Sequence, residues 1–356
     1  MESEEVLRRP FDAHHHLGPS SLTLGCGSQV VKKILNRKPH ANVTSFKCVT
    51  VDAPFLFAIC LTLLLLLTKT VDAQDLGHKL PGGIGLDAGR VPEPGLYLVN
   101  RVVSYEADEI RDRTGNVIPI GDLELAALGN GTGISYTFAL TQSGVVLTVS
   151  ASLPVARLRL NIQDRPEASI DRFGLTDFYI QPARLGWRSD RFELVGSYGL
   201  YLPSGISVLA GGKGLSSGHV THQFSTGGTI FASKDRTVFL TALASYDLNL
   251  RKRGIDITRG DTFQVQGGVG VSRFHRGLEA GLAFYQLSQV HPDGGADLPP
   301  VIRGARDAVY GLGPEMAVMV KAIRSQVRVR YEWDMGVRSR PKGNIFVVGL
   351  TLVAHR

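Results

Sequence analysis

The stretch RSQVRVRYEWD, residues 324 to 334, decides the fold. Its even positions all carry charged or amide side chains, whereas its odd positions from 327 onward carry Val, Val, Tyr and Trp. Because successive side chains of a β-strand point to opposite faces, the stretch predicts a strand with one apolar, aromatic-tipped face and one charged face. In a soluble sandwich the charged face would meet water. In an outer-membrane barrel that face lines the lumen, and the apolar face meets lipid.

The same alternation recurs along the chain from residue 95 to residue 353, in short segments separated by turn signals. No part of this region has a convincing helical period, and the pattern is typical of barrel strands. We therefore predict an all-β fold, a transmembrane antiparallel β-barrel of about twelve strands. The expected strands are residues 95–106, 131–141, 144–153, 177–188, 191–202, 223–233, 236–249, 261–273, 276–288, 308–320, 324–335 and 344–353.

The lengths of the connections supply a second signal. Long and short connections alternate, as do the extracellular loops and periplasmic turns of outer-membrane barrels. A soluble sandwich has no reason to alternate them, so we expect a barrel in the outer membrane of a Gram-negative bacterium. Short turns are expected at 141–144, 188–191, 234–236, 274–277 and 321–324, and long connections at 107–130, 154–176, 203–222, 250–260, 289–307 and 336–343.

The N-terminal part has the features of a secretory leader. The apolar run FLFAICLTLLLLL, residues 55–67, follows several basic residues and is too short for a spanning helix, which needs roughly 20 residues. We interpret residues 1–73 as a leader with a signal peptide cleaved after Ala73, where Val71 and Ala73 form a small-residue signal. The alternative is an uncleaved anchor. Residues 74–93 are rich in Gly and Pro and are expected to form a periplasmic linker before a barrel at 94–356. All three cysteines precede the proposed cut, so no disulfide is expected in the mature chain.

Several short pieces stand in a fairly specific order and spacing along the chain: PGLYL at 94–98, DRTGN at 112–116, QPARLGW at 181–187, YLPSG at 201–205, YDLN at 246–249, GLAFYQ at 281–286 and GLGPE at 311–315. Together they resemble the outer-membrane proteins named for the MetA-pathway of phenol degradation. These pieces span roughly 94 to 353, although the C-terminal residues 353–356 lack the terminal aromatic usual in such barrels. The resemblance implies a barrel related to fatty-acid and aromatic-hydrocarbon channels, through which small, often aromatic, compounds cross the outer membrane.

The sequence offers little support for an enzyme. His219 and His222 lie in a long connection near Ser216 and Ser217, an arrangement that allows a metal site or a hydrolase site. We interpret them instead as solvated loop residues, and we expect no catalytic residue, cofactor or metal. The small net positive charge is spread along the chain and does not indicate a nucleic-acid partner.

The inward faces of the predicted strands are the better candidates for function, because charged rings set the selectivity of pores. Glycines at 268, 270 and 281 favour an open lumen, while cross-lumen ion pairs would fill a narrow barrel. We expect a monomer, inserted by the barrel-assembly machinery into lipid, that passes small hydrophobic or aromatic compounds passively. The alternative is a closed structural or loop-binding barrel without transport. The expected lumen-lining residues are Asp177, Glu193, Asp247, Asn249, Gln264, Gln266, Glu279, Glu315, Arg328, Arg330, Glu332 and Asp334.

Overall fold

The computed structural model describes residues 77–78, 81–140, 144–163, 167, 169–274 and 276–355. The chain divides into two units, Met1–Lys69 and Thr70–Arg356, and every described residue belongs to the second. The expected leader, including its apolar run at 55–67 and the cleavage position after Ala73, lies outside the described residues.

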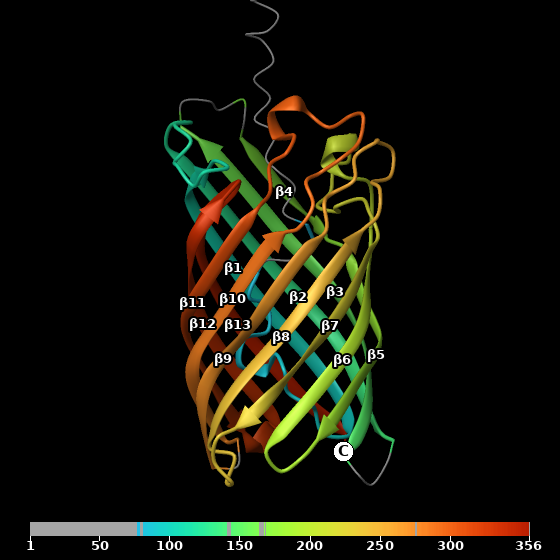
Figure 1. Cartoon of the computed structure of the whole chain (residues 1–356), viewed down its shortest axis with the longest axis vertical. Helices are drawn as coiled ribbons and strands as arrows, with labels where there is room; N and C mark the ends of the chain where they lie inside the picture. Colours follow the sequence, from blue (N-terminus) through green and yellow to red (C-terminus); the bar gives the residue numbers. More distant parts are fainter. Residues whose placement is uncertain are drawn as a thin grey trace, which may run out of the picture. The chain divides into compact units, whose positions relative to one another are not determined.

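Twelve antiparallel strands close into a barrel, which confirms the predicted fold class (Figure 1). Each strand pairs with its sequence neighbour, and β1 pairs with β13 to close the ring. Each observed strand overlaps one of the twelve predicted ranges. The strands are β1 (Gly95–Arg111), β2 (Leu123–Ala139), β3 (Val145–Ile162), β5 (Phe178–Arg188), β6 (Phe192–Leu202), β7 (Thr221–Phe231), β8 (Val238–Asn249), β9 (Thr262–Arg273), β10 (Leu278–Gln289), β11 (Ala308–Val320), β12 (Ser325–Arg338) and β13 (Arg340–His355).

A thirteenth strand, β4 (Ile170–Leu175), continues β5 beyond Thr176 and Asp177. The first part of β3 pairs with β5 and its later part pairs with β4. The barrel wall is therefore taller here than predicted, and the expected connection at 154–176 shortens to 163–169. The described helices are short 3-10 turns, and none of them is long or apolar enough to cross a membrane. They are η2 (Gly85–Asp87), η4 (Val208–Ala210), η5 (Pro300–Ile302) and η6 (Lys321–Ile323).

The predicted long connection at 336–343 is wrong. Residues up to Arg338 extend β12 and residues from Arg340 extend β13, leaving only Ser339 between them. The two extensions do not pair with each other: β13 from Arg340 pairs with β1, and the end of β12 pairs with β11. The remaining long connections gather at the upper end of the barrel in Figure 1, which we call the loop end. The short turns and the C-terminus lie at the opposite end, called the turn end.

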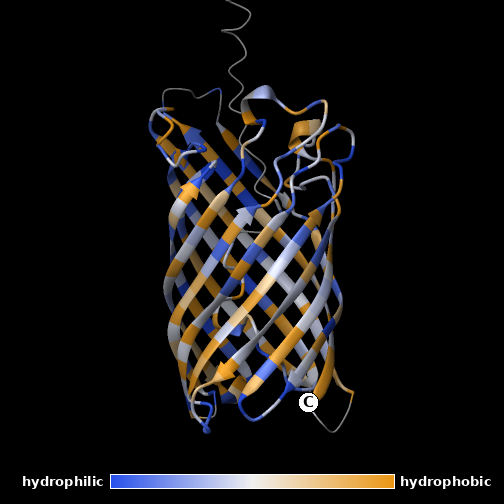
Figure 2. Ribbon diagram, in the orientation of Figure 1, coloured by the Kyte–Doolittle hydropathy of each residue, from blue (hydrophilic) through white to orange (hydrophobic). Residues whose placement is uncertain are grey.

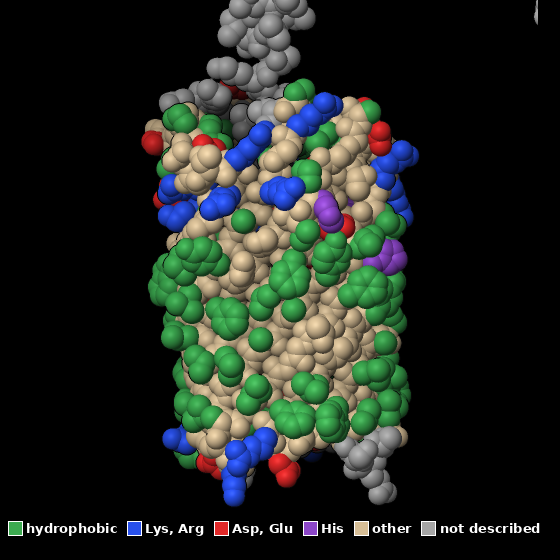
Figure 3. Space-filling model, in the orientation of Figure 1, with side chains coloured by type: hydrophobic (Ala, Val, Ile, Leu, Met, Phe, Trp, Pro, Cys, Tyr) green, Lys and Arg blue, Asp and Glu red, His purple; other side chains and the backbone are tan. Residues whose placement is uncertain are grey.

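The outer face of the barrel is apolar, as a lipid-facing surface requires. Apolar and polar residues alternate along the strands, and apolar side chains cover the middle of the visible face while charged side chains lie toward its two ends (Figures 2 and 3). In the stretch 324–334, Val329 and Trp333 are exposed whereas Arg328 and Arg330 are buried. The strand therefore faces the way its sequence predicts.

Candidate functional site: the barrel interior

Residues 81–93, which we call the lumen segment, lie inside the barrel. The sequence analysis expected a periplasmic linker at 74–93, whereas residues 81–93 of that range contact the inner wall of the barrel. The chain passes from His78 at the loop end through the interior to Gly95, where β1 begins at the turn end. A segment rich in Gly and Pro has no apolar period and therefore appears as a linker in sequence. In the structure those residues allow its backbone to approach the barrel wall.

Four backbone N–H groups of the lumen segment donate hydrogen bonds to side chains of the wall. The residues that accept them come from four strands, so the segment is fixed along most of its length. The bonds run from Ile84 N to Gln266 Oε1 (3.0 Å), from Leu86 N to Glu315 Oε2 (3.1 Å), from Gly89 N to Thr241 Oγ1 (2.8 Å) and from Val91 N to Glu193 Oε2 (2.9 Å).

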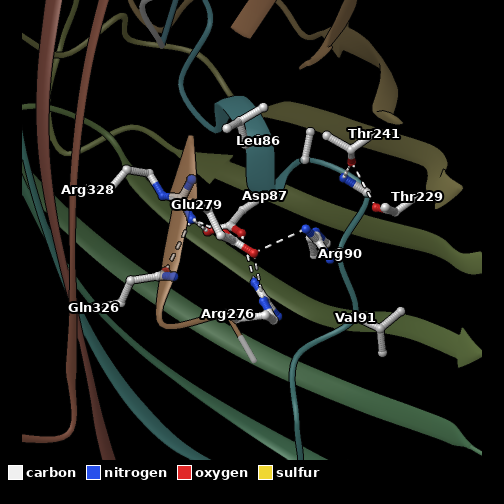
Figure 4. Close-up of polar contacts among 12 residues, drawn as sticks. Leu86, Asp87, Arg90, Val91, Thr229, Thr241, Arg276, Glu279, Gln326 and Arg328 are labelled. Atoms are coloured by element: carbon white, nitrogen blue, oxygen red, sulfur yellow. Dashed lines mark hydrogen bonds and ion pairs between the residues drawn. The ribbon is translucent and has the colours of Figure 1, made fainter. Parts of the chain in front are cut away.

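Two charged side chains of the lumen segment enter an ionic cluster with the wall (Figure 4). Asp87 pairs with Arg328 at 2.6 Å and with Arg276 at 3.4 Å. Arg90 pairs with Glu279 at 3.2 Å, and Glu279 also accepts a hydrogen bond from Arg276 Nε at 3.0 Å. Because Arg90, Glu279 and Arg328 are buried, losing a partner of one of them would leave its charge poorly compensated.

Glu315 connects this cluster to Arg330, the next inward arginine of β12. It accepts hydrogen bonds from Arg328 and, at 3.2 Å, from Arg330, which also pairs with Glu332 at 2.8 Å. Arg330 in addition donates to the carbonyl of Gly82 in the lumen segment. Arg328 and Arg330 are therefore neutralised by carboxylates and hold the lumen segment in place.

At the loop end, Asp177 binds the start of the described chain. It accepts hydrogen bonds from His78 Nδ1 (2.7 Å), Ser216 Oγ (2.6 Å) and the backbone N–H of Ser217 (2.9 Å). Burial alone would raise the pKa of Asp177, but these hydrogen bonds outweigh burial and hold that pKa well below its usual range. The His78 ring also stacks on Tyr201, with ring centroids 4.8 Å apart.

All twelve residues expected to line the lumen are buried. Six of them, at positions 193, 266, 279, 315, 328 and 330, contact the lumen segment. Asp177 contacts His78, and Glu332 pairs with Arg330. The other four face neighbouring strands or the cavity described below: Asp247 accepts from Gln223 and Thr262, Asn249 donates to the carbonyl of Gly260, Asp334 accepts from two tyrosines, and Gln264 has no hydrogen-bond partner among the described residues.

The buried carboxylate of Asp334 joins side chains from β1 and β10, and its removal should lower the stability of the barrel measurably. It accepts hydrogen bonds from Tyr105 (3.0 Å), from Tyr285 and from the backbone N–H of Gly343 (3.1 Å). Asp334→Ala leaves these buried donors short of an acceptor, so we expect the free energy of unfolding to fall by about 1–3 kcal/mol. Guanidinium unfolding in detergent micelles measures the change, with the exposed Asp108→Ala as control. Equal effects of both variants would contradict the role of Asp334.

A cavity of about 1070 Å³ lies beside the lumen segment. It extends from Tyr97 and Val353 near the turn end to Thr176 and Asp177 near the loop end. The space exists because β2 and β3 turn only small side chains toward it, while their bulkier neighbours point outward. The small residues that line it are Gly129, Gly131, Gly133 and Ser135 on β2, and Thr148, Ser150, Ser152, Pro154 and Ala156 on β3.

Three arginines that the sequence analysis did not single out hold the lumen segment from the cavity side. Arg101 on β1 donates to the carbonyl of Gly83. Arg184 and Arg188 on β5 donate to carbonyls of residues 88, 90 and 91 at 3.2, 3.0 and 2.7 Å. Each of these arginines occupies an inward-facing position of a strand, and this position could be read from the sequence. It does not indicate a function until one knows that the lumen segment lies inside the barrel.

A family model described as the MetA-pathway of phenol degradation matches residues 107–348, which is more than half of the chain. The chain belongs to this family. The resemblance carried by pieces such as QPARLGW at 181–187 is thereby confirmed. No curated protein sequence matches this member of the MetA-pathway family.

Solved structures similar to this MetA-pathway family member include an outer membrane channel from Pseudomonas putida F1. The two share 12% sequence identity and a TM-score of 0.65 over 75% of this chain and 97% of that chain, which shows a common fold. A FadL homologue from Pseudomonas aeruginosa is 10% identical, with a TM-score of 0.41 over 78% of this chain and 99% of that chain. The β domain of the Bordetella autotransporter BrkA is 12% identical, with a TM-score of 0.43 over 73% and 99% of the two chains.

The glycine at 268 does not provide the open space that the sequence suggested. In this MetA-pathway barrel a Cβ atom at Gly268 would lie 2.5 Å from the Leu86 side chain and 2.4 Å from the Leu282 carbonyl oxygen. Gly268 therefore lets the wall accept the lumen segment. The space in the barrel comes instead from β2 and β3.

The histidines considered as metal ligands do not converge on one site. His219 is fully buried, with its ring centroid 4.5 Å from that of His78, while His222 Nδ1 lies 2.8 Å from the hydroxyl of Tyr198. Within the described ranges, no three His, Cys, Asp or Glu residues are grouped to hold a metal ion. Ser216 and Ser217 are engaged by Asp177.

Proposed function

We propose that this protein is an outer-membrane channel for the passive uptake of small hydrophobic or aromatic compounds. The observation that carries the proposal is the cavity of about 1070 Å³, which reaches from one end of the strands toward the other along the side that the lumen segment leaves free. Membership in the phenol-degradation family supports an aromatic substrate class. The fold shared with the Pseudomonas putida channel supports a transmembrane barrel as the scaffold.

The chemistry of the cavity wall suits an amphipathic solute. Val99 and Val103 on β1 and Ile345 and Val347 on β13 line one side, and Tyr179 and Tyr201 line the cavity near its loop end. Sites for small molecules typically combine apolar walls with a few polar groups in a volume of roughly 300–1,000 Å³. An aromatic compound of one ring fits this description, and no energy-coupling element is needed for its diffusion.

A second candidate is a sealed barrel whose loops bind an external partner. The observation that favours it is the attachment of the lumen segment, whose residues Asp87 and Arg90 are held by ion pairs. In that case the segment is a permanent filling of the interior, and the cavity is a residual space. The two candidates differ in whether solutes cross.

The test is release of solutes from liposomes that contain the protein purified from outer membranes. Benzoate and phenyltrimethylammonium serve as charged aromatic probes, because neutral phenol crosses lipid unaided, and a neutral pentose serves as control. We expect both aromatic ions to leave faster than the pentose. Folded protein that releases none of the three solutes would overturn the channel and favour the sealed barrel.

We further infer that the mature chain begins after Ala73, that it is a monomer, and that the barrel-assembly machinery inserts it. Closure of the barrel within one chain supports a monomer, since no strand edge is left to pair with a partner. N-terminal sequencing of the purified protein tests the cleavage position, and light scattering in detergent tests the monomer. A first residue other than Gln74 or a larger mass would contradict these inferences.

A further inference from the structure

One row of inward-facing residues crosses five adjacent strands in register. The register pairs Arg184 with Ser197, Ser197 with Ser225, Ser225 with Ser245, and Ser245 with Gln264. All five residues line the cavity. Neighbouring strands lie about 4.8 Å apart, so the row forms an arc of closely spaced polar groups. We call it the polar row.

The polar row can donate many hydrogen bonds but contains no carboxylate. A guanidinium group, three hydroxyls and an amide are its polar groups. The nearest inward carboxylate on these strands beyond Ser245 is Asp247, which accepts hydrogen bonds from Gln223 at 2.7 Å and from Thr262 at 3.2 Å. The polar row therefore presents hydrogen-bond donors to the cavity, and no unengaged carboxylate lies beside it on these strands. A set of groups of this kind suits the binding of an anionic oxygen.

Part of the polar row lacks hydrogen-bond partners. Ser245 Oγ and both amide atoms of Gln264 are buried and have no partner among the described residues. Buried polar groups in proteins are normally satisfied, because an unsatisfied group costs about 1–3 kcal/mol. Ser245 and Gln264 are register partners on β8 and β9, and both line the cavity. Their unsatisfied groups therefore indicate that a polar ligand forms the missing hydrogen bonds.

Arg184 supplies the positive charge of the row. It donates through Nη2 to the carbonyls of Ala88 and Arg90 in the lumen segment, but no carboxylate among the described residues lies within 4.0 Å of its guanidinium group. By contrast, the other inward arginine of β5, Arg188, pairs with Glu93 at 2.9 Å. A guanidinium group that makes no ion pair can bind an anion, and its planar fork matches a carboxylate.

Apolar groups adjoin the polar row. Leu243 precedes Ser245 by two positions on β8 and lines the cavity, as do Ile84 and Val91 of the lumen segment. We propose that the polar row binds the carboxylate of a small organic monoanion whose apolar or aromatic body lies against these three side chains. The inference deepens the proposed channel function and rests on it.

The test is binding of benzoate to the full-length protein in detergent, measured by isothermal titration calorimetry, with benzamide as the neutral probe of the same shape. We expect benzoate to bind more tightly than benzamide. Arg184→Gln should weaken benzoate binding by roughly ten- to hundredfold, since a hydrogen bond to a charged group is lost. Ser245→Ala combined with Gln264→Leu should weaken it by a smaller factor, and neither variant should alter benzamide binding.

Arg188→Gln is the matched control, because it removes an arginine from the same strand and a hydrogen bond to the same lumen segment. It should leave benzoate affinity unchanged. Equal losses in Arg184→Gln and Arg188→Gln, or equal binding of benzoate and benzamide to the unmodified protein, would overturn the site. If liposomes then still release benzoate and phenyltrimethylammonium at equal rates, the channel stands without an anion site, whereas release of neither ion refutes the channel itself.

Discussion

Glu315→Ala is expected to lower the free energy of unfolding by about 3–5 kcal/mol, because it removes the buried carboxylate that Arg328 and Arg330 share and leaves part of their charge uncompensated. Glu315 is fully enclosed and lies between Arg328 and Arg330, and it also accepts the backbone N–H of Leu86. The substitution therefore weakens both the wall and its contact with the lumen segment. Heat- or urea-induced unfolding in detergent, followed by the change in gel mobility of the folded barrel, measures the effect.

Glu106→Ala is the control for this prediction, because Glu106 lies on β1 and is exposed. Exposed substitutions of this kind usually change stability by about 0.5 kcal/mol or less. Combined replacement of Glu315, Arg330 and Glu332 by apolar residues of similar size should recover part of the loss, since it removes Arg330 together with both of its carboxylate partners. A Glu315→Ala barrel as stable as the Glu106→Ala barrel would show that the ionic cluster contributes nothing to the fold.

Gly89→Ala is expected to displace the lumen segment and to raise ion conductance through the barrel. A Cβ atom at position 89 would lie 2.0 Å from the carbonyl oxygen of Gly228 on β7. The wall cannot yield there without breaking strand pairing, and overpacking of this kind costs about 1–3 kcal/mol. Release of the segment avoids that cost but loses the hydrogen bond from Gly89 N to Thr241.

Single-channel recording in planar bilayers measures the result, and limited proteolysis reports whether residues 81–93 have become accessible. Gly196→Ala on β6 is the control, since a Cβ atom there meets no atom within 4 Å. We expect higher conductance and faster cleavage only in Gly89→Ala. Unchanged conductance together with unchanged proteolysis would mean that the wall adapts and that the segment is not displaced.

The strands were predictable because their signal is local. Apolar and polar residues alternate with a period of two, as at residues 324–334, and this alternation determines which side chains face lipid. Once the sheet closes into a barrel, the side chains on the opposite face lie inside it. For the same reason, all twelve expected interior residues are buried. The wrong connection at 336–343 arose because residues 340–343 pair with β1 across the barrel seam, far away in sequence.

The lumen segment was not predictable from local pattern. Most of its contacts join residues more than 90 positions apart, from 94 positions for Arg90 with Arg184 to 248 positions for Gly82 with Arg330. Because the backbone of the segment is held by hydrogen bonds but forms no strand or long helix, its sequence has no periodic pattern of apolar and polar residues. The polar row was missed for a related reason, since a single inward serine such as Ser225 has meaning only once the register aligns it with Arg184 and Gln264.

The lumen segment also bears on the order in which the barrel can assemble. β1 follows the segment directly, and its partner is β13, so the ring cannot close until the last strand is available. Contacts of such long sequence separation carry a large loop-closure entropy and fold slowly. Leu86 and Asp87 already reach β11 and β12 through Glu315 and Arg328, independently of the pairing between β1 and β13. The segment thus forms a second link between the first and last strands of the barrel, one that does not depend on the hydrogen bonds of the β1–β13 seam.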